Sequence, residues 1–99
     1  MHNEDRNITY YLSPGIIWIV QYRGVEVVDE LSRQSETLFY PEAAIWDLLC
    51  RGHCQNKVSI MLTFILDVLE KETKELTEQC ISRWLKAGWI IQDNLMENQ

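Results

Sequence analysis

The sequence contains no long hydrophobic run, little glycine and few positive charges. Its longest apolar stretch spans residues 16–20, whereas a membrane helix needs roughly 18 apolar residues or more. The four glycines fall at expected turns and helix ends, so there is no glycine-rich loop to cradle a phosphate. Nine Lys and Arg residues against 15 Asp and Glu residues give a net charge of −6, and the cations are spread along the chain. This charge disfavours nucleic acid and anionic membranes, which are bound through clusters of cations.

Residues suited to catalysis or metal binding are also scarce. The only histidines are His2 and His53, and the G-x-S-x-G and H-E-x-x-H motifs are absent. Cys50 or Cys54 could pair with His53 as a nucleophile, but no third orienting group is evident. The same residues form a C-x-x-H-C cluster, which Cys80 could complete as a four-ligand zinc site. Because the paired C-x-x-C of common zinc modules is missing, and free cysteine is often a small core residue, we expect no catalytic residue, metal or cofactor.

The cysteines and the first residues together indicate where the protein works. The three cysteines are an odd number and lack the spacing of a disulfide framework, which is typical of a reducing compartment. Residues 1–5 are acidic and lack the basic and apolar parts of a secretory signal. We therefore expect a cytoplasmic protein.

The hydrophobic pattern predicts one α+β domain. Ninety-nine residues, 46% of them apolar and 24% charged, suffice for one modest core. β-Branched and aromatic residues predict three strands, at residues 16–22, 25–30 and 35–40. From Pro41 the apolar spacing becomes helical and predicts helices at about residues 41–51, 57–69 and 73–87. Strands followed by helices favour a three-stranded antiparallel sheet packed against a three-helix cluster.

Several features of the ends and the helices refine this expectation. Residues 1–13 and 92–99 are predicted to be a flexible segment and a flexible tail, although Ile8, Tyr10 and Tyr11 could dock locally. Asn56 and Thr73 are expected to cap the second and third helices. Apolar residues surround nearly the whole second helix, which predicts burial on most of its sides. The third helix carries its apolar residues in one half-circle: Leu76, Cys80, Ile81, Trp84 and Leu85.

A small sheet of this kind suggests a way to bind peptides. An outer strand presents unpaired N–H and C=O groups, to which an incoming extended chain can bond as an additional strand. Main-chain bonds of this type tolerate many sequences, and neighbouring pockets provide specificity. The ordinary alternative is a short outer strand with no partner, in which Phe39 or Trp84 simply belongs to the core.

Two stretches of the chain, and the hairpin that ends in Val27-Val28-Asp29-Glu30, resemble one known family. Residues 37–52, TLFYPEAAIWDLLCRG, resemble the L-N-P-x-A-x-x-I-W-x-L-L-x-G signature of the PqqD-like family, named for coenzyme PQQ synthesis protein D. Residues 80–91, CISRWLKAGWII, are similar to the v-x-x-F-L-x-x-L-x-x-x-G-L-I ending of that family. The resemblance covers about residues 14–91. Tyr40 stands where the family has an Asn that would cap the first helix.

This resemblance implies a fold and a function. The fold is a three-helix winged helix-turn-helix with a three-stranded sheet, called a RiPP recognition element, over residues 14–91. Such domains bind the leader of a ribosomally made precursor peptide, without catalysis, and present it to a modifying enzyme, often a radical SAM protein. The leader adds as a strand beside the third strand, in the groove facing the third helix. The resemblance places the peptide-binding residues at Ser35, Thr37, Leu38, Phe39, Tyr40, Leu76, Gln79, Cys80, Arg83 and Trp84.

The contacts within this groove form a hypothesis of their own. Apolar leader side chains are expected to enter between Thr37 or Phe39 and the border of the third helix, and Arg83 and Lys86 are expected to attract acidic leader residues. One alternative function is a winged-helix DNA-binding domain, although the third helix carries few cations. Another is a protein–protein adaptor or a homodimer, which the apolar second helix would favour.

Overall fold

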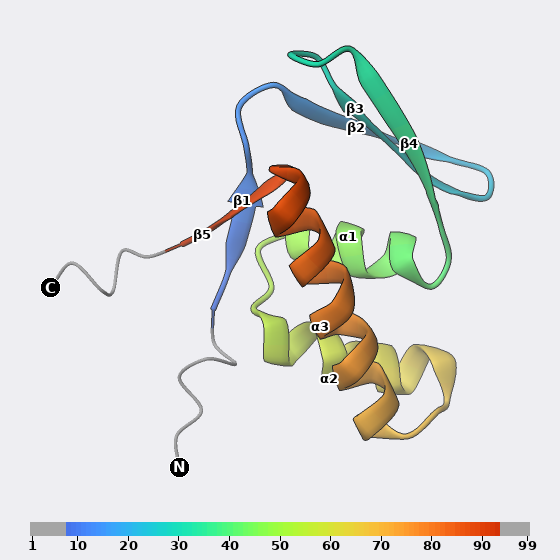
Figure 1. Cartoon of the computed structure of the whole chain (residues 1–99). Helices are drawn as coiled ribbons and strands as arrows, with labels where there is room; N and C mark the ends of the chain where they lie inside the picture. The colour runs from blue at the N-terminus through green and yellow to red at the C-terminus, as the bar shows by residue number, and fades with distance from the viewer. Residues whose placement is uncertain (1–7, 94–99) are drawn as a thin grey trace, which may run out of the picture.

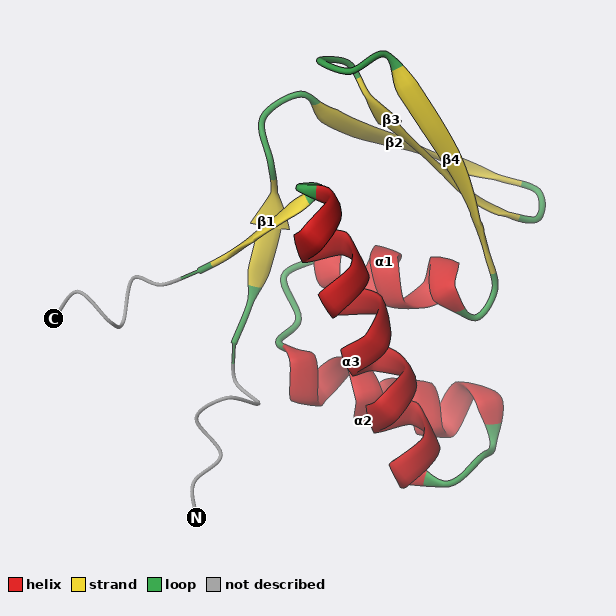
Figure 2. Ribbon diagram, viewed as in Figure 1, coloured by secondary structure: helices red, strands yellow, loops and turns green. Residues whose placement is uncertain are grey.

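The computed structural model describes residues 8–93, which form five strands and three helices (Figures 1 and 2). The strands are β1 (Tyr10–Leu12), β2 (Ile16–Gln21), β3 (Gly24–Asp29), β4 (Gln34–Phe39) and β5 (Ile90–Gln92). The helices are α1 (Glu42–Cys50), α2 (Gln55–Leu66) and α3 (Glu70–Ala87). The predicted α+β class is confirmed. No helix in the described range is long and apolar enough to cross a bilayer.

The three predicted strands form one antiparallel sheet in the order β2-β3-β4. Successive side chains of each strand alternate between the two faces of the sheet. Val25, Val27 and Leu38 are buried on the face that packs against the helices, while the intervening residues are more exposed. Figure 2 shows the helices gathered on this one side of the sheet.

Gly24 occupies a position in this sheet that leaves no room for a side chain. A Cβ atom added to Gly24 would collide with the backbone carbonyl oxygen of Leu38 on β4. Since backbone atoms cannot move aside as a flexible side chain can, we expect Gly24→Ala to lower the free energy of unfolding by about 1–3 kcal/mol. Denaturant unfolding measures this change. Ser35→Ala, at an exposed position of β4, is the control and should change stability by less than about 0.5 kcal/mol; equal stability of the two variants would contradict the account.

The helix starts differ from those predicted. Cys54, not Asn56, lies at the N-cap of α2. Asp67 is the C-cap residue that follows α2, and its φ of 57° is left-handed. Helix α3 begins three residues before Thr73, which therefore lies inside the first turn and not at the cap. The Thr73 hydroxyl donates to the carbonyl oxygen of Glu70 and lies 2.8 Å from the hydroxyl of Thr63 on α2. Thr73, which the sequence predicted as a helix cap, therefore makes a partly buried polar contact between α2 and α3.

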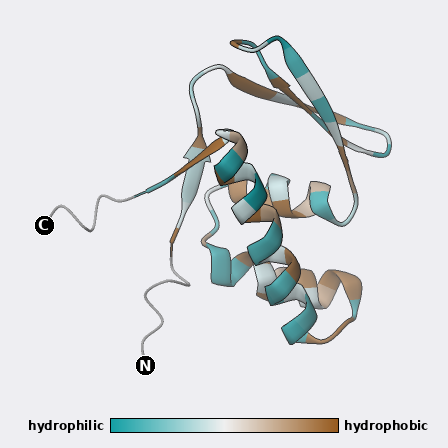
Figure 3. Cartoon of the chain, in the orientation of Figure 1, coloured by the Kyte–Doolittle hydropathy of each residue, from teal (hydrophilic) through white to brown (hydrophobic). Residues whose placement is uncertain are grey.

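The prediction that α2 is buried on most sides is wrong. Only Val58, Ser59 and Leu62 of α2 are buried, because the helix packs through one face against α1 and α3. Phe64 is 82% exposed, and apolar neighbours at the C-terminal end of α2 and in the following turn are also exposed. Figure 3 shows this hydrophobic stretch in brown at the end of α2.

The ends of the described chain pair with each other, which the sequence did not predict. β1 and β5 form a second, two-stranded antiparallel sheet in which Leu12 lies opposite Ile90. Tyr10 and Ile90 are buried in the core. The expectation of flexible ends is therefore wrong for β1 and for Gln92; the rest of those predicted segments, residues 1–7 and 94–99, lies outside the described residues.

The core lies between the sheet and the helices and is centred on tryptophan. Trp46 of α1 and Trp84 of α3 are fully buried, with ring centroids 5.1 Å apart and planes at 87°. Trp89 makes a second edge-to-face contact with Trp46 at 5.9 Å. These favourable aromatic contacts join α1, α3 and the start of the β5 segment, and so fix the position of α3 below the sheet.

Candidate functional site

The outer edge of β4 is open to an additional strand. β4 is an outer strand of its sheet, and no other segment of residues 8–93 pairs with its free side. The direction of its backbone groups follows from the hairpins. Glu30 N–H donates to the carbonyl oxygen of Gly15, which lies on the β2 side. The backbone groups of successive residues in a strand point to opposite sides, so the even-numbered residues of β3 bond to β2 and the odd-numbered residues bond to β4. Their partners on β4 are Gln34, Glu36 and Leu38.

The remaining residues of β4 therefore direct their backbone groups away from the sheet. These are Ser35, Thr37 and Phe39, each of which presents its N–H and C=O groups at the free edge. The side chains of Ser35 and Phe39 are exposed and that of Thr37 is half-buried. These three alternate residues present enough free backbone groups for a short incoming strand to form hydrogen bonds along this edge.

The β4 side chains that face α3 are not the ones that the sequence predicted. Leu38 is buried against the helices, and Glu36 lies on the same face, near Arg83 of α3. Alternation places Thr37 and Phe39 on the opposite face of the sheet, where Phe39 is 57% exposed. The expectation that leader side chains enter between Thr37 or Phe39 and the third helix is therefore wrong. The β4 side chains that face α3 are Glu36 and Leu38.

A pocket lies between α1 and α3 on the side of β4. Its volume is about 150 Å³, and it is lined by Glu42, Leu76, Gln79, Cys80 and Arg83. Four of these residues belong to the predicted site, because positions 76, 79, 80 and 83 share one side of a helix. Leu76 and Cys80 provide an apolar base, and Gln79 and Arg83 are exposed at the rim.

Ion pairs connect the two sides of this groove. Arg83 Nη2 donates to Glu42 Oε1 at 3.2 Å and lies 4.0 Å from Glu36 Oε2. Glu36 and Glu42 were not among the predicted residues, although strand alternation relative to Leu38 points to Glu36. Because Arg83 already contacts two carboxylates, the expectation that it attracts acidic leader residues loses its basis.

Three predicted site residues lie in the core and not at the surface. Leu38, Cys80 and Trp84 are buried. They form the support beneath the groove, and of these three residues Cys80 also lines the pocket. Tyr40, by contrast, is exposed just beyond the end of β4.

Burial makes the Cys80 thiol a weaker acid than an exposed thiol and predicts that the stability of the protein depends on pH. Desolvation, followed by the Glu42 carboxylate, raises the pKa of Cys80 from 9.0 to about 11, while Arg83 lowers it in part. Because the folded-state pKa lies above the ordinary value, the folded protein holds this proton more tightly than the unfolded chain. The corresponding stabilisation is fully present below about pH 9 and is lost as the pH rises through 11. We expect the free energy of unfolding to fall over this range.

The contribution of Cys80 is measured by comparison with Cys80→Ala. Urea unfolding at pH 7, 9 and 10.5 should show a smaller decline in the variant than in the wild type. Cys50, whose pKa burial and Asp47 raise to about 12, remains in both proteins and cancels in the comparison. Parallel declines in the two proteins would show that Cys80 does not titrate in this way.

The cysteine–histidine cluster does not form a metal site in the described part of the chain. No group of three or more His, Cys, Asp or Glu residues there is arranged to hold a metal ion. Cys50, His53 and Cys54 lie at the end of α1 and in the connection to α2, whereas Cys80 lies on the core side of α3. All three cysteines are free thiols.

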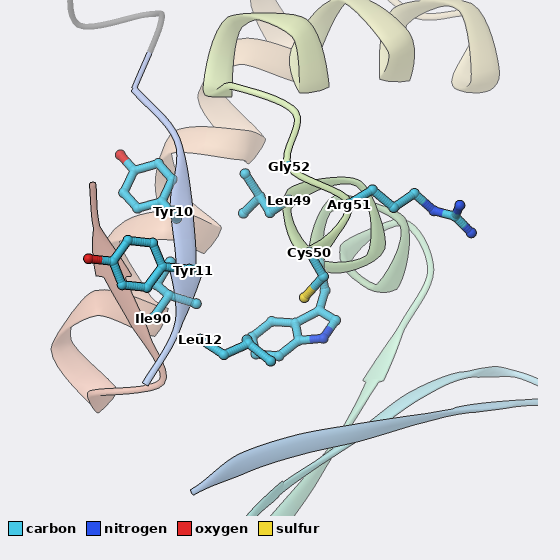
Figure 4. Close-up of a pocket in the computed structure, with 9 residues that line it drawn as sticks. Tyr10, Tyr11, Leu12, Leu49, Cys50, Arg51, Gly52 and Ile90 are labelled. Atoms are coloured by element: carbon cyan, nitrogen blue, oxygen red, sulfur yellow. The ribbon is translucent and has the colours of Figure 1, made fainter. Parts of the chain in front are cut away.

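A second pocket of about 360 Å³ lies beside β1, β5 and the C-terminal end of α1 (Figure 4). Apolar side chains such as Leu12, Leu49 and Ile90 form much of its lining, and Arg51 and Gly52 lie at the side of α1. The hydroxyl of Tyr10 donates to Gln55 Oε1 at 3.2 Å. These residues provide no pair of a nucleophile and a base.

Comparison with known proteins identifies the fold. No protein-family model matches this chain, and no curated protein matches it. A solved structure described as "Lasso peptide synthetase B1 complexed with the leader peptide" superposes with a TM-score of 0.77. The two proteins share one fold. The match covers 83% of this chain and 96% of the synthetase B1 chain, at 21% sequence identity. The resemblance to the PqqD-like family in particular stays a prediction.

Proposed function

We propose that this protein binds the leader of a ribosomally made precursor peptide and presents it to a modifying enzyme, without catalysing a reaction itself. The observation that carries the proposal is the open edge of β4 beside the pocket on α3. The fold shared with a synthetase B1 that was solved with a leader peptide supports it.

The leader would bind as a fourth strand of the sheet. Its backbone would exchange hydrogen bonds with Ser35, Thr37 and Phe39, which present their N–H and C=O groups at the free edge. Every second leader side chain would then lie on the same face as Glu36 and Leu38, toward α3. One apolar side chain of this set would enter the pocket above Leu76 and Cys80. The intervening leader side chains would extend the outer face beside Thr37 and Phe39.

The protein's own contribution is to hold the leader in one register. A leader is extended and flexible before binding, so ordering it costs conformational entropy and limits the affinity to about the micromolar range.

The modifying enzyme would be a radical SAM protein or another peptide-modifying enzyme, in the PQQ pathway or in another peptide pathway. The three free cysteines are compatible with a protein that works in the reducing cytoplasm.

Calorimetric titration tests the proposal. The probe is a synthetic peptide that covers the N-terminal segment of a short open reading frame adjacent to the gene for this chain, taken as the candidate precursor. We expect a 1:1 complex with a dissociation constant of about 1–100 μM. The negative control is a scrambled peptide of the same composition. If neither the adjacent leader nor any truncation of it binds more tightly than the scrambled peptide, the proposed function is wrong.

A further inference from the structure

Glu36 is the charged residue of β4 that faces α3, and its carboxylate is only weakly paired. Arg83 Nη2 lies 4.0 Å from Glu36 Oε2 but makes its hydrogen bond, at 3.2 Å, to Glu42. The Glu36 and Arg83 side chains are each 49% exposed, so solvent screens their interaction. The cross-strand neighbour of Glu36 on β3 is Val27, which offers no hydrogen bond. Glu36 thus retains capacity to bind a cation at the free edge of the sheet.

The rows of side chains across the sheet show what an added strand would meet. One row consists of Trp18, Val27 and Glu36, and the next row on the same face consists of Val20, Val25 and Leu38. A leader residue that extends the Leu38 row continues an apolar row. A leader residue that extends the Glu36 row meets a carboxylate, with Cβ atoms about 5 Å apart. The two leader residues are separated by one residue, because alternate residues share a face.

The charge balance in the groove favours a cation in the second position. Glu36 and Glu42 together carry two negative charges, and Arg83 supplies one positive charge, so these three residues leave a net charge of −1. An opposite charge directly across two strands stabilises the pair, and a like charge destabilises it. An acidic leader residue at this position would oppose Glu36 and compete with both carboxylates for Arg83.

We infer that Glu36 selects leaders in which a basic residue lies two positions from an apolar residue. The inference rests on the proposed function, since it assigns the chemistry of the peptide that pairs with β4. The apolar residue enters beside Leu38 and the pocket of Leu76 and Cys80, and the Lys or Arg residue pairs with Glu36.

Selection from a peptide library tests this specificity. The probe is an mRNA-displayed library of random 14-residue peptides, selected in parallel on the wild type, Glu36→Lys, Glu36→Gln and Glu26→Lys. Glu26→Lys is the matched control, because it changes the charge equally but lies on the opposite face of the central strand. Thermal unfolding confirms that each variant is folded, and Glu36→Gln removes the charge with the smallest change in shape.

We expect the wild type and Glu26→Lys to enrich Lys or Arg two positions from an apolar residue. Glu36→Gln should lose this preference, and Glu36→Lys should enrich Asp or Glu there. For the best wild-type peptide, replacing the basic residue by Glu should weaken binding about fivefold, and Glu36→Lys should reverse the order. Peptides enriched with the same charge pattern on every variant would overturn the inference while leaving strand addition intact. The absence of any enriched peptide on the wild type would overturn the proposed function and this inference together.

Discussion

Trp46→Ala is expected to lower the free energy of unfolding by about 3–5 kcal/mol, the usual cost of removing a fully buried tryptophan. Trp46 is fully buried and contacts two further rings edge-to-face, those of Trp84 and Trp89. Its Nε1 atom has no hydrogen-bond partner, so the loss comes from packing and the cavity left behind. Because a domain of this size is stable by only about 5–15 kcal/mol, this loss is a large fraction of the total free energy of unfolding.

Chemical denaturation followed by circular dichroism measures this effect. Tyr22→Ala is the control, because Tyr22 is an aromatic residue that is 95% exposed in the turn between β2 and β3. We expect the control to change stability by less than about 0.5 kcal/mol. A Trp46→Ala variant as stable as the Tyr22→Ala variant would contradict the described core.

Thr37→Pro is expected to weaken peptide binding about 30-fold or more while the protein remains folded. Proline removes the N–H group at the centre of the free β4 edge, and its ring occupies the space that an incoming carbonyl oxygen needs. The bonds between β3 and β4 survive, because Thr37 directs its backbone groups away from β3. The measurement is calorimetric titration with the tightest peptide from the displayed library.

Thr37→Val is the control for this substitution, because it keeps the N–H group and nearly the same shape. Because Thr37 lies on the outer face of the sheet and no hydrogen bond of its hydroxyl is seen in the described structure, we expect the affinity of this variant to stay within about threefold of the wild type. Wild-type affinity in a folded Thr37→Pro variant would mean that the peptide does not pair with β4, whatever the rest of the groove contributes.

The parts of the fold that could be predicted are those with a local pattern. The three strands of the main sheet appear in the β-branched residues, and the change of period at Pro41 marks the first helix. β1 and β5 could not be predicted in this way, because three residues are too few to show alternation. Their pairing depends on residues that are far apart in the sequence, such as Tyr11 and Ile91, which are 80 positions apart. The exposed end of α2 was misjudged because hydropathy alone does not show which side of a helix has a neighbour.

The candidate site also has a part that could be predicted from the sequence and a part that could not. Leu76, Gln79, Cys80 and Arg83 could be grouped from helical spacing, and one pocket contains all four. The orientation of β4 was the part that could not be derived, because Leu38 and Phe39 are adjacent apolar residues and either one fits the core. In the structure Leu38 is the buried residue, and Glu36, two positions earlier on the same face of β4, therefore lies on the side of α3. Interactions with Glu36 and Glu42 therefore emerged only from tertiary structure.

Amide hydrogen exchange at β4 tests strand addition most directly. The protein is compared with and without the tightest library peptide, residue by residue, by NMR. Strand addition predicts that the amides of Ser35, Thr37 and Phe39 exchange rapidly in the free protein and become protected in the complex. Those of Glu36 and Leu38, bonded to β3, should be slow in both states. Saturation with peptide that leaves the Ser35, Thr37 and Phe39 amides as fast as before would contradict the account.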